Sequence, residues 1–300
     1  MKKMPKLLTV VASVTLLLGA CGSTSVSEKN NDGNKQVSNE EEGIEKVIAG
    51  AEMKDGTYTL KEKDFDDHGW KASMTITVKG GKITESTYNY EDENGKLKSE
   101  DEGYQKNMSE KTGVGPKDYI PQLNEELVKS QDAQRVDVVT GATHSSETFL
   151  NYAQQLIQAS QKGDTSTIEI DTRAPLVDGV YSLVEKNIGS TGWKTYLNIT
   201  VKDGQIIESD YNYLNKDGDL KTNDEGYQEK MKEKTGTGPQ DFIPALNKSL
   251  VEKQNPAEVD VVTGASHSSQ TFKMYAAQLV NAAQKGDTTK IEIDNYVYSK

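Results

Sequence analysis

The sequence has one cysteine, Cys21, and three histidines among 300 residues. A single thiol allows no internal disulfide and no thiolate metal cluster. The histidines, at positions 68, 144 and 267, are far apart in the sequence, so no cluster of metal ligands is expected. The Gly-x-Gly-x-x-Gly pattern of NAD-binding domains and the Gly-x-Ser-x-Gly pattern of many hydrolases are also missing. We therefore expect no metal site and no catalytic residue of these types.

The N-terminal apolar run is too short to be a membrane-spanning helix. Residues 7–18 form an uncharged stretch that follows Lys2, Lys3 and Lys6. A permanent span needs about 20 residues, whereas a basic start before a shorter apolar segment is typical of a cleaved secretory signal. We assign the signal peptide to residues 1–20.

The signal ends in Leu18-Gly19-Ala20-Cys21. This sequence resembles the lipobox of bacterial lipoproteins, in which the cysteine is acylated and becomes the new N-terminus. The resemblance implies that Cys21 is the lipidation site and that the protein is anchored to the outer face of the cell membrane. Two or more acyl chains on one residue give a stable anchor. The alternative is a signal peptide with an incidental cysteine.

Residues 21–50 are expected to form a disordered tether. After the cysteine they are mostly Ser, Asn, Asp, Glu and Gly, which bury too little apolar surface to fold. The root-mean-square reach of such a segment is on the order of 30 Å. Loss of the three signal-peptide lysines takes the formal net charge from −12 to −15. This acidic balance argues against nucleic acid as a partner.

The rest of the sequence is an internal repeat with a spacing of 123 residues. Between residues 54–171 and 177–294, 69 of 118 positions are identical without a gap. A repeat of this length is a whole domain, because solenoid units are about 20–50 residues long. We therefore predict two tandem homologous domains, a first half (51–172) and a second half (173–300).

Each half has the pattern of an α+β domain, a small antiparallel sheet with packed helices. Apolar and polar side chains alternate over residues 72–78, which indicates a half-buried strand. A hairpin turn is expected at Gly80-Gly81, with neighbouring strands at 57–63 and 82–90.

Helices are expected at 103–111 and 118–129, with Pro121 tolerated only in the first turn of the second helix. A third helix is expected where apolar residues recur at helical spacing. These residues are Phe149, Tyr152, Ala153, Leu156 and Ile157, and they are repeated as Phe272, Tyr275, Ala276, Leu279 and Val280.

One stretch is repeated almost unchanged. Val-Asp-Val-Val-Thr-Gly-Ala-Thr-His-Ser-Ser occupies residues 136–146 and returns at 259–269 with Ser266 in place of Thr143. The β-branched start predicts a strand, Gly141 predicts a tight turn or a close approach, and the last Thr or Ser is expected at a helix N-cap. An anion at that place meets free N–H groups and the positive end of the helix dipole. Ordinary capping by the hydroxyl group is the alternative.

The aspartates of this stretch are a second notable feature. Asp137 and Asp260 are expected within apolar strands, where a carboxylate is costly without a partner.

The pattern Asp-x-x-Thr-Gly-Ala-Thr/Ser resembles the signature of the covalent FMN-binding domain family. In that family a flavin transferase uses FAD to attach FMN through a phosphoester to the last hydroxyl of the motif. The resemblance implies two covalent FMN groups, derived from FAD and attached to Thr143 and Ser266. It also implies cofactor-binding roles for the other motif residues: Asp137, Thr140, Gly141, Ala142, Asp260, Thr263, Gly264 and Ala265.

Three further groups have two interpretations each. His144 and His267 either contact the phosphate or are solvated residues of a first helical turn. Aromatic residues at strand spacing either flank a flavin ring or pack in the sheet. These aromatics are Trp70, Tyr88, Tyr90, Trp193, Tyr211 and Tyr213. The Gly-rich segments 112–116 and 235–239 either contact the ring or separate two helices.

The resemblance implies an electron carrier rather than an enzyme with its own substrate site. The chain looks like the flavinylated two-domain lipoproteins of Gram-positive bacteria. In these, a membrane NADH dehydrogenase and a quinone reduce the flavins, which pass electrons to extracellular acceptors such as ferric iron. The cofactor supplies the redox chemistry and the protein supplies position and environment.

Other functions are compatible with the sequence alone. A non-redox ligand-binding lipoprotein would use the motif only as a helix start. A hydrolase with Thr143 or Ser266 as nucleophile is disfavoured, because no base is positioned by the sequence. The cleaved signal peptide is also a candidate source of a peptide pheromone.

Overall fold

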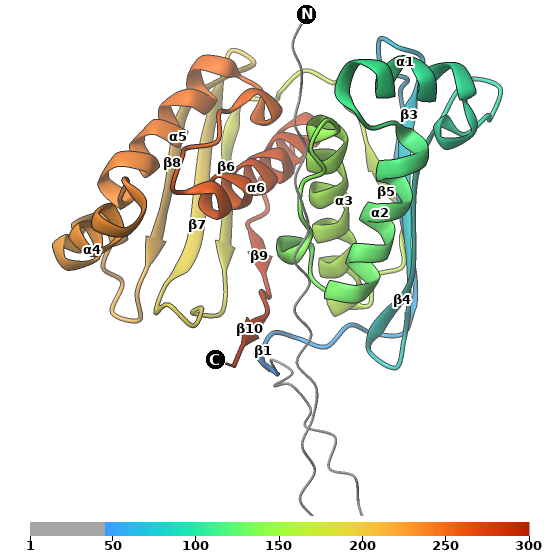
Figure 1. Ribbon diagram of the computed structural model, residues 1–300. Coiled ribbons are helices and arrows are strands. Elements are labelled where there is room, and N and C mark those ends of the chain that lie inside the picture. The colour runs from blue at the N-terminus through green and yellow to red at the C-terminus, as the bar shows by residue number, and fades with distance from the viewer. Residues whose placement is uncertain (1–45, 300) are drawn as a thin grey trace, which may run out of the picture. The chain divides into compact units, whose positions relative to one another are not determined.

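A four-stranded sheet is the centre of each half of the chain (Figure 1). The first sheet has the order β4-β3-β2-β5, with β2 (Gly56–Glu62), β3 (Lys71–Lys79), β4 (Lys82–Glu91) and β5 (Ile168–Ile170). The second has the order β8-β7-β6-β9, with β6 (Gly179–Glu185), β7 (Lys194–Lys202), β8 (Gln205–Leu214) and β9 (Ile291–Ile293). The computed structural model describes residues 46–299. The predicted signal peptide (1–20) and Cys21 lie outside the described residues.

The predicted hairpin is confirmed in both halves. Along β3 the apolar side chains lie on a buried face and the polar side chains between them on a partly exposed face, as the sequence pattern indicates. The turn residues Gly80 and Gly81 have φ values of 59° and 71°, and Asp203 and Gly204 have 52° and 71°. Positive φ at both central residues is the requirement of a type I′ hairpin turn.

Each sheet is mixed rather than purely antiparallel. Strand β5 pairs in parallel with β2, with Leu60 opposite Ile168, and β9 pairs in the same way with β6. A parallel neighbour needs a long crossover, and all the helices of each half lie in that crossover. The α+β class predicted from the sequence is confirmed.

Three helices follow the hairpin in each half (Figure 1), and the second and third of them pack on the sheet. They are α1 (Glu102–Thr112), α2 (Pro116–Ser130) and α3 (Thr143–Lys162) in the first half, and α4 (Glu225–Thr235), α5 (Pro239–Lys253) and α6 (Ser266–Lys285) in the second. Helix α2 packs on β4, and α3 packs on β2 and β3. The predicted apolar face of α3 is buried. None of these helices, within residues 46–299, is long and apolar enough to cross a membrane.

Pro121 lies inside helix α2 rather than in its first turn. The helix begins at Pro116, five residues earlier than Pro121. The prediction placed the helix start too late, because Pro116 is itself a favoured first residue. Pro121 lies on the exposed face, so the carbonyl group that loses its helical N–H partner faces water.

The predicted tether ends earlier than residue 50. Strand β1 (Val47–Ala49) pairs with β10 (Val297–Tyr298), close to the other end of the chain. A segment without its own core is ordered here by strand pairing, which the local composition does not reveal.

Helices α3 and α6 pack against each other and join the two halves. Gln155 Nε2 donates to Asn281 Oδ1 at 3.1 Å, and Gln158 Nε2 donates to Gln278 Oε1 at 3.0 Å. At the repeat spacing of 123 residues, Gln155 corresponds to Gln278 and Gln158 corresponds to Asn281, so the two hydrogen bonds join equivalent pairs of positions. The contact is therefore approximately two-fold symmetric, as in an isologous interface.

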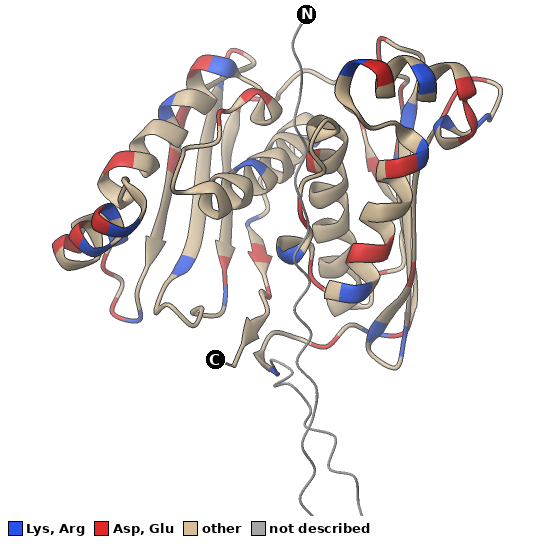
Figure 2. Cartoon of the chain, in the orientation of Figure 1, with Lys and Arg blue, Asp and Glu red and all other residues tan. Residues whose placement is uncertain are grey.

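One ion pair breaks this symmetry. Each of the two helices carries only two charged residues, and most charges lie on the outer helices and the turns (Figure 2). Lys273 Nζ pairs with Glu147 Oε1, and the two side chains are only 8% and 14% exposed. The symmetry-related positions hold Leu150 and Gln270.

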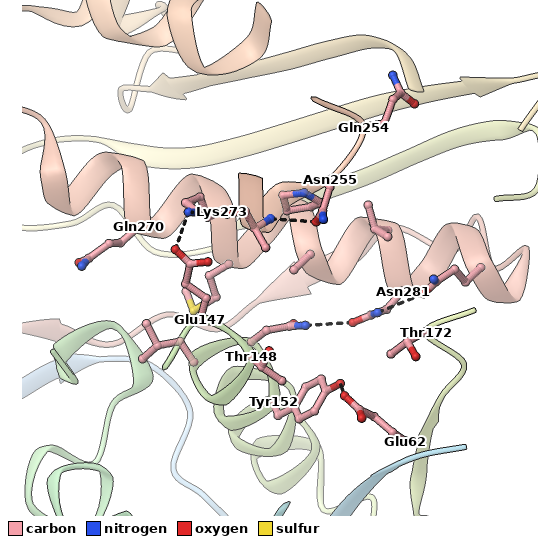
Figure 3. A pocket seen from close by; sticks show the side chains of 18 of the residues that line it. Glu62, Glu147, Thr148, Tyr152, Thr172, Gln254, Asn255, Gln270, Lys273 and Asn281 are labelled. Atoms are coloured by element: carbon pink, nitrogen blue, oxygen red, sulfur yellow. Dashed lines mark hydrogen bonds and ion pairs between the residues drawn. The ribbon is translucent and has the colours of Figure 1, made fainter. Parts of the chain in front are cut away.

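The ion pair lies in a cavity of about 450 Å³ between the two helices (Figure 3). Lys273 Nζ also donates to the carbonyl oxygen of Ala257 at 3.1 Å. In the same cavity Tyr152 donates its hydroxyl hydrogen to Glu62 Oε1 at 2.5 Å. Burial raises the pKa of the Glu62 carboxyl group.

Candidate functional site

The repeated motif connects a short 3-10 helix to a long α-helix. It lies between η2 (Ala133–Arg135) and α3 in the first half, and between η4 (Pro256–Glu258) and α6 in the second. The strand predicted at 136–139 is wrong, because these residues join no sheet. Val136 and Val139 are buried, so their β-branched side chains fill the core without taking part in a ladder.

A tight turn follows, as predicted. The N–H of Ala142 donates to the carbonyl oxygen of Val139 at 2.9 Å, and Gly141 has a φ of 85°. A positive φ at the third residue is the requirement of a type II turn. A Cβ atom on Gly141 would also lie 2.5 Å from the carbonyl oxygen of Thr112. Glycine is therefore needed both for the turn and for close contact with the Gly-rich segment 112–116.

A buried serine holds the turn against the helix. The hydroxyl group of Ser146 donates to the carbonyl oxygen of Ala142 at 3.0 Å and accepts from the N–H of Val139 at 3.1 Å. Ser269 makes both contacts in the second half, at 2.9 Å and 3.1 Å. The sequence alone predicts no role for either serine, although both copies carry one at this position.

Thr143 and Ser266 are the first helical residues and not N-caps. The N-cap positions are Ala142 and Ala265, which have no capping side chain. The backbone N–H groups of the first three residues of each helix, residues 143–145 and 266–268, have no acceptor within residues 46–299. Ordinary capping by the hydroxyl groups is therefore wrong.

The other helices of each half start differently. Carboxylates accept from the first-turn or N-cap N–H groups of α1, α2, α4 and α5. The residues are Asp101, Asp118, Asp224 and Asp241. Among the described helices longer than one turn, the two that lack such a cap are the two that begin with the motif. An uncapped N-terminus offers free N–H groups and a partial positive charge to an anion.

The hydroxyl residue that begins each motif helix faces solvent. Thr143 and Ser266 are exposed, and so are Thr140 and Thr263. Neither Thr143 nor Ser266 has a side-chain hydrogen bond within the described part of the chain, so both hydroxyl groups are available for chemistry. His144 and His267 are also exposed.

The prediction that the motif aspartates lie in apolar strands is wrong. Asp137 and Asp260 are exposed, because residues 136–139 and 259–262 run along the surface and bury only Val136, Val139 and Val259. Ala142 and Ala265 are buried under the turn. The two carboxylates therefore need no buried partner.

Four tyrosines place the sheet beside the first helical turn. The hydroxyl group of Tyr88 donates its hydrogen to the hydroxyl group of Tyr90 at 2.5 Å, and its oxygen lies 3.2 Å from the carbonyl oxygen of Ser145. Burial raises the pKa of both tyrosines. Tyr211 and Tyr213 repeat the arrangement. The aromatic side chains predicted at strand spacing are thus sheet-packing residues that also support the start of α3 and α6.

A cavity of about 440 Å³ opens beside the start of α6. His267 and Ser268 line it, together with Tyr213, Tyr227 and Lys221. Most of the other lining residues are polar, and the carboxylate residues Asp132 and Glu185 are among them. The volume is within the range of sites for a small molecule or cofactor. The sequence alone predicts no role for Lys221.

Comparison with known proteins identifies the family. The model of the FMN-binding domain matches residues 68–158. A 15 kDa lipoprotein of Treponema pallidum (strain Nichols) is 36% identical over 113 residues, which are 38% of this chain and 80% of that protein. The chain belongs to the FMN-binding domain family. The internal repeat adds the second copy of the domain.

Two solved structures are also similar to parts of the chain. A crystal structure of a protein from Clostridium perfringens is 39% identical, with 40% of this chain and 99% of that chain covered and a TM-score of 0.39. A solution NMR structure from Clostridium thermocellum is 28% identical, with 35% of this chain and 91% of that chain covered and a TM-score of 0.25.

The residues of the site fit FMN. The uncapped helix start suits a phosphate, and the cavity beside the second motif has aromatic and cationic side chains for a ring. The helix starts and the turns that shape them are the same in both halves of this FMN-binding protein.

Proposed function

We propose that the protein is a lipid-anchored electron carrier with two covalent FMN groups, one on Thr143 and one on Ser266. Electrons come from a membrane NADH dehydrogenase and quinone and leave to extracellular acceptors such as ferric iron. The observation that carries the proposal is the exposed, unbonded hydroxyl group on the first residue of an uncapped helix, present twice. The positions of Thr143 and Ser266 both suit a phosphodiester, because the backbone N–H groups of the first helical turn are free to bind its oxygen atoms.

The attachment step needs a flavin transferase and FAD. The hydroxyl oxygen of Thr143 or Ser266 forms a bond to the FMN phosphorus of FAD, the bond between the two phosphates breaks, AMP leaves, and the hydroxyl proton is released. Gly141 and Gly264 keep the turn before each hydroxyl group free of a side chain. The remaining motif residues, Asp137, Thr140 and Ala142 with their counterparts Asp260, Thr263 and Ala265, are proposed to shape the surface that the transferase and cofactor contact.

FMN supplies two-electron chemistry on the donor side and one-electron chemistry on the acceptor side. One quinol is oxidised to quinone by transfer of two electrons and two protons. Two ferric ions are then each reduced by one electron, and the two protons pass to water. The protein's part is to hold the cofactor at its surface and to set its potential.

Anchoring at the outer face of the membrane is proposed from Cys21. The Treponema pallidum relative is named a lipoprotein, and the chain carries a lipobox-like sequence before Cys21. Acylation of this residue, with palmitate among the acyl chains, would hold two flavins near the membrane donor on a tether of about 25 residues, with a reach on the order of 30 Å. A pheromone released from the signal peptide stays a prediction, since residues 1–20 lie outside the described part.

Intact mass and visible absorbance test the proposal. Protein made together with its flavin transferase should gain two FMN masses and absorb as a flavin. Thr143→Ala and Ser266→Ala should each remove one FMN mass, and the double variant should be colourless. Thr165→Ala, which removes an exposed threonine away from the motif, should leave both. An unmodified mass would contradict the proposal and favour a ligand-binding lipoprotein.

A further inference from the structure

Each half of the protein buries a lysine whose ammonium group has no hydrogen-bond acceptor within residues 46–299. Lys221 is 6% exposed. Its Nζ lies 4.2 Å from the ring centre of Tyr227, 4.3 Å from that of Tyr213 and 5.7 Å from that of Trp193. Attraction to the aromatic faces favours the charged form, but it satisfies none of the three N–H donors of an ammonium group.

The first half repeats this arrangement. Lys98 is 5% exposed, and its Nζ lies 4.3 Å, 4.4 Å and 5.6 Å from the ring centres of Tyr104, Tyr90 and Trp70. Burial lowers the pKa of both lysines to about 8, so both are mainly charged at neutral pH. Neither Nζ atom is fully closed off from solvent, and nearby carboxylates also favour the charged form, from Asp66 and Glu62 at Lys98 and from Asp224 at Lys221. Two largely buried lysines without a hydrogen-bond acceptor among residues 46–299, in the same place in each half, indicate a shared role.

The aromatic rings around Lys221 lie next to the start of helix α6. Lys221 lines the cavity beside α6, which His267 and Ser268 also line. Tyr213 contacts Ser268 through its hydroxyl group and Lys221 through its ring. The ammonium group is therefore separated from the uncapped helix start by one tyrosine side chain. A phosphate on Ser266 would have the free N–H groups of the helix, and the lysine would meet another part of the cofactor.

We propose that Lys221 and Lys98 bind the pyrimidine edge of the flavin, at N1 and the C2 carbonyl oxygen, and raise its reduction potential. The proposal rests on the proposed function, since it requires flavins on Ser266 and Thr143. Reduction by the two electrons of the quinol, with uptake of one of its two protons and release of the other to water, leaves one negative charge on this edge of the ring. The ammonium group then gains the acceptor that it lacks and balances the charge. Charge near N1 is one of the means by which proteins tune flavins.

The test uses a protein with one flavin. In a Thr143→Ala background, Lys221→Met should weaken the preference for reduced over oxidised flavin about tenfold, because a hydrogen bond to a charged group is lost. For a two-electron couple this shifts the midpoint potential by about 30 mV to more negative values. Lys221→Arg keeps the charge and should restore most of the potential. Lys98→Met in a Ser266→Ala background repeats the test for the other flavin.

The control is an exposed lysine in the same half. Lys216→Met removes one charge from a side chain that is 77% exposed, and the midpoint potential should not change. An unchanged potential in Lys221→Met, or an equal shift in Lys216→Met, would overturn the role of the lysine while the flavin mass still supports the proposed function. A missing flavin in the unsubstituted protein would instead overturn the proposed function. If Lys221→Met does not fold, the comparison of Lys221→Arg with Lys221→Gln decides.

Discussion

The ion pair between α3 and α6 offers a sharp test of what joins the two halves. Lys273 and Glu147 are only 8% and 14% exposed, and Glu147 Oε2 has no hydrogen-bond partner in the described part of the chain. Lys273→Leu places the residue of the symmetry-related position, Leu150, on α6. It leaves the Glu147 carboxylate buried without a cation.

The expected cost follows from this burial. Removal of one partner of a buried pair destabilises a protein by about 3–5 kcal/mol, whereas replacement of both partners is close to neutral or stabilising. The double variant Glu147→Gln, Lys273→Leu makes the interface symmetric, since Gln270 already occupies the other copy. At roughly 2–4 °C for each kcal/mol in a protein of this size, the single variant should melt roughly 6–20 °C lower. The double variant should melt within a few degrees of the unsubstituted protein.

Calorimetry and urea unfolding of the unsubstituted protein, the single variants Lys273→Leu and Glu147→Gln, and the double variant give the coupling energy between the two residues. Separation of one melting transition into two in Lys273→Leu would show that the pair couples the halves. Equal stability of Lys273→Leu and the double variant would contradict this expectation, because the Glu147 carboxylate would then need no cation.

Three further predictions concern the motif and the two buried lysines, Lys98 and Lys221. Gly141→Ala should lower both the stability and the amount of flavin attached. Gly113→Ala, at a similar φ of 82° but in open space, should lower only the stability. Equal flavin masses in the two variants would contradict a need for close contact between Gly141 and Thr112. Ser146→Ala leaves a buried N–H group without its acceptor and should cost about 1–3 kcal/mol in urea unfolding, and a smaller loss would mean that water replaces the hydroxyl group. Burial holds the pKa of Lys98 and Lys221 near 8, below the unfolded value of about 10.4. Between these two pKa values the unfolded chain binds more protons than the folded protein, so the free energy of unfolding should rise with pH. Urea unfolding from pH 7.5 to 9.5 should show this slope, and substitution of both lysines by Met should flatten it.

Some features of the fold were predictable because they depend on local pattern. Alternation along β3 has a period of two, and the apolar face of α3 has the period of a helix, so each segment carries its own signal. The repeat fixed the number of domains by identity alone. The failures occurred where local preference was overridden. Residues 136–139 have the composition of a strand, yet Ser146 takes the N–H group of Val139 that a ladder would need.

The candidate site divides in the same way. The sequence determined which residues form the motif, that it occurs twice, and that the hydroxyl residue is Thr143 in one copy and Ser266 in the other. Only the tertiary structure decided that these hydroxyl groups begin uncapped helices and face solvent, that Asp137 is exposed, and that Lys221 is buried among aromatic rings. The physical reason is that burial and unsatisfied hydrogen bonds depend on partners far away in the sequence. The local sequence predicts that a lysine after a hairpin is exposed, and only the packing of the sheet and the neighbouring helix buries Lys221.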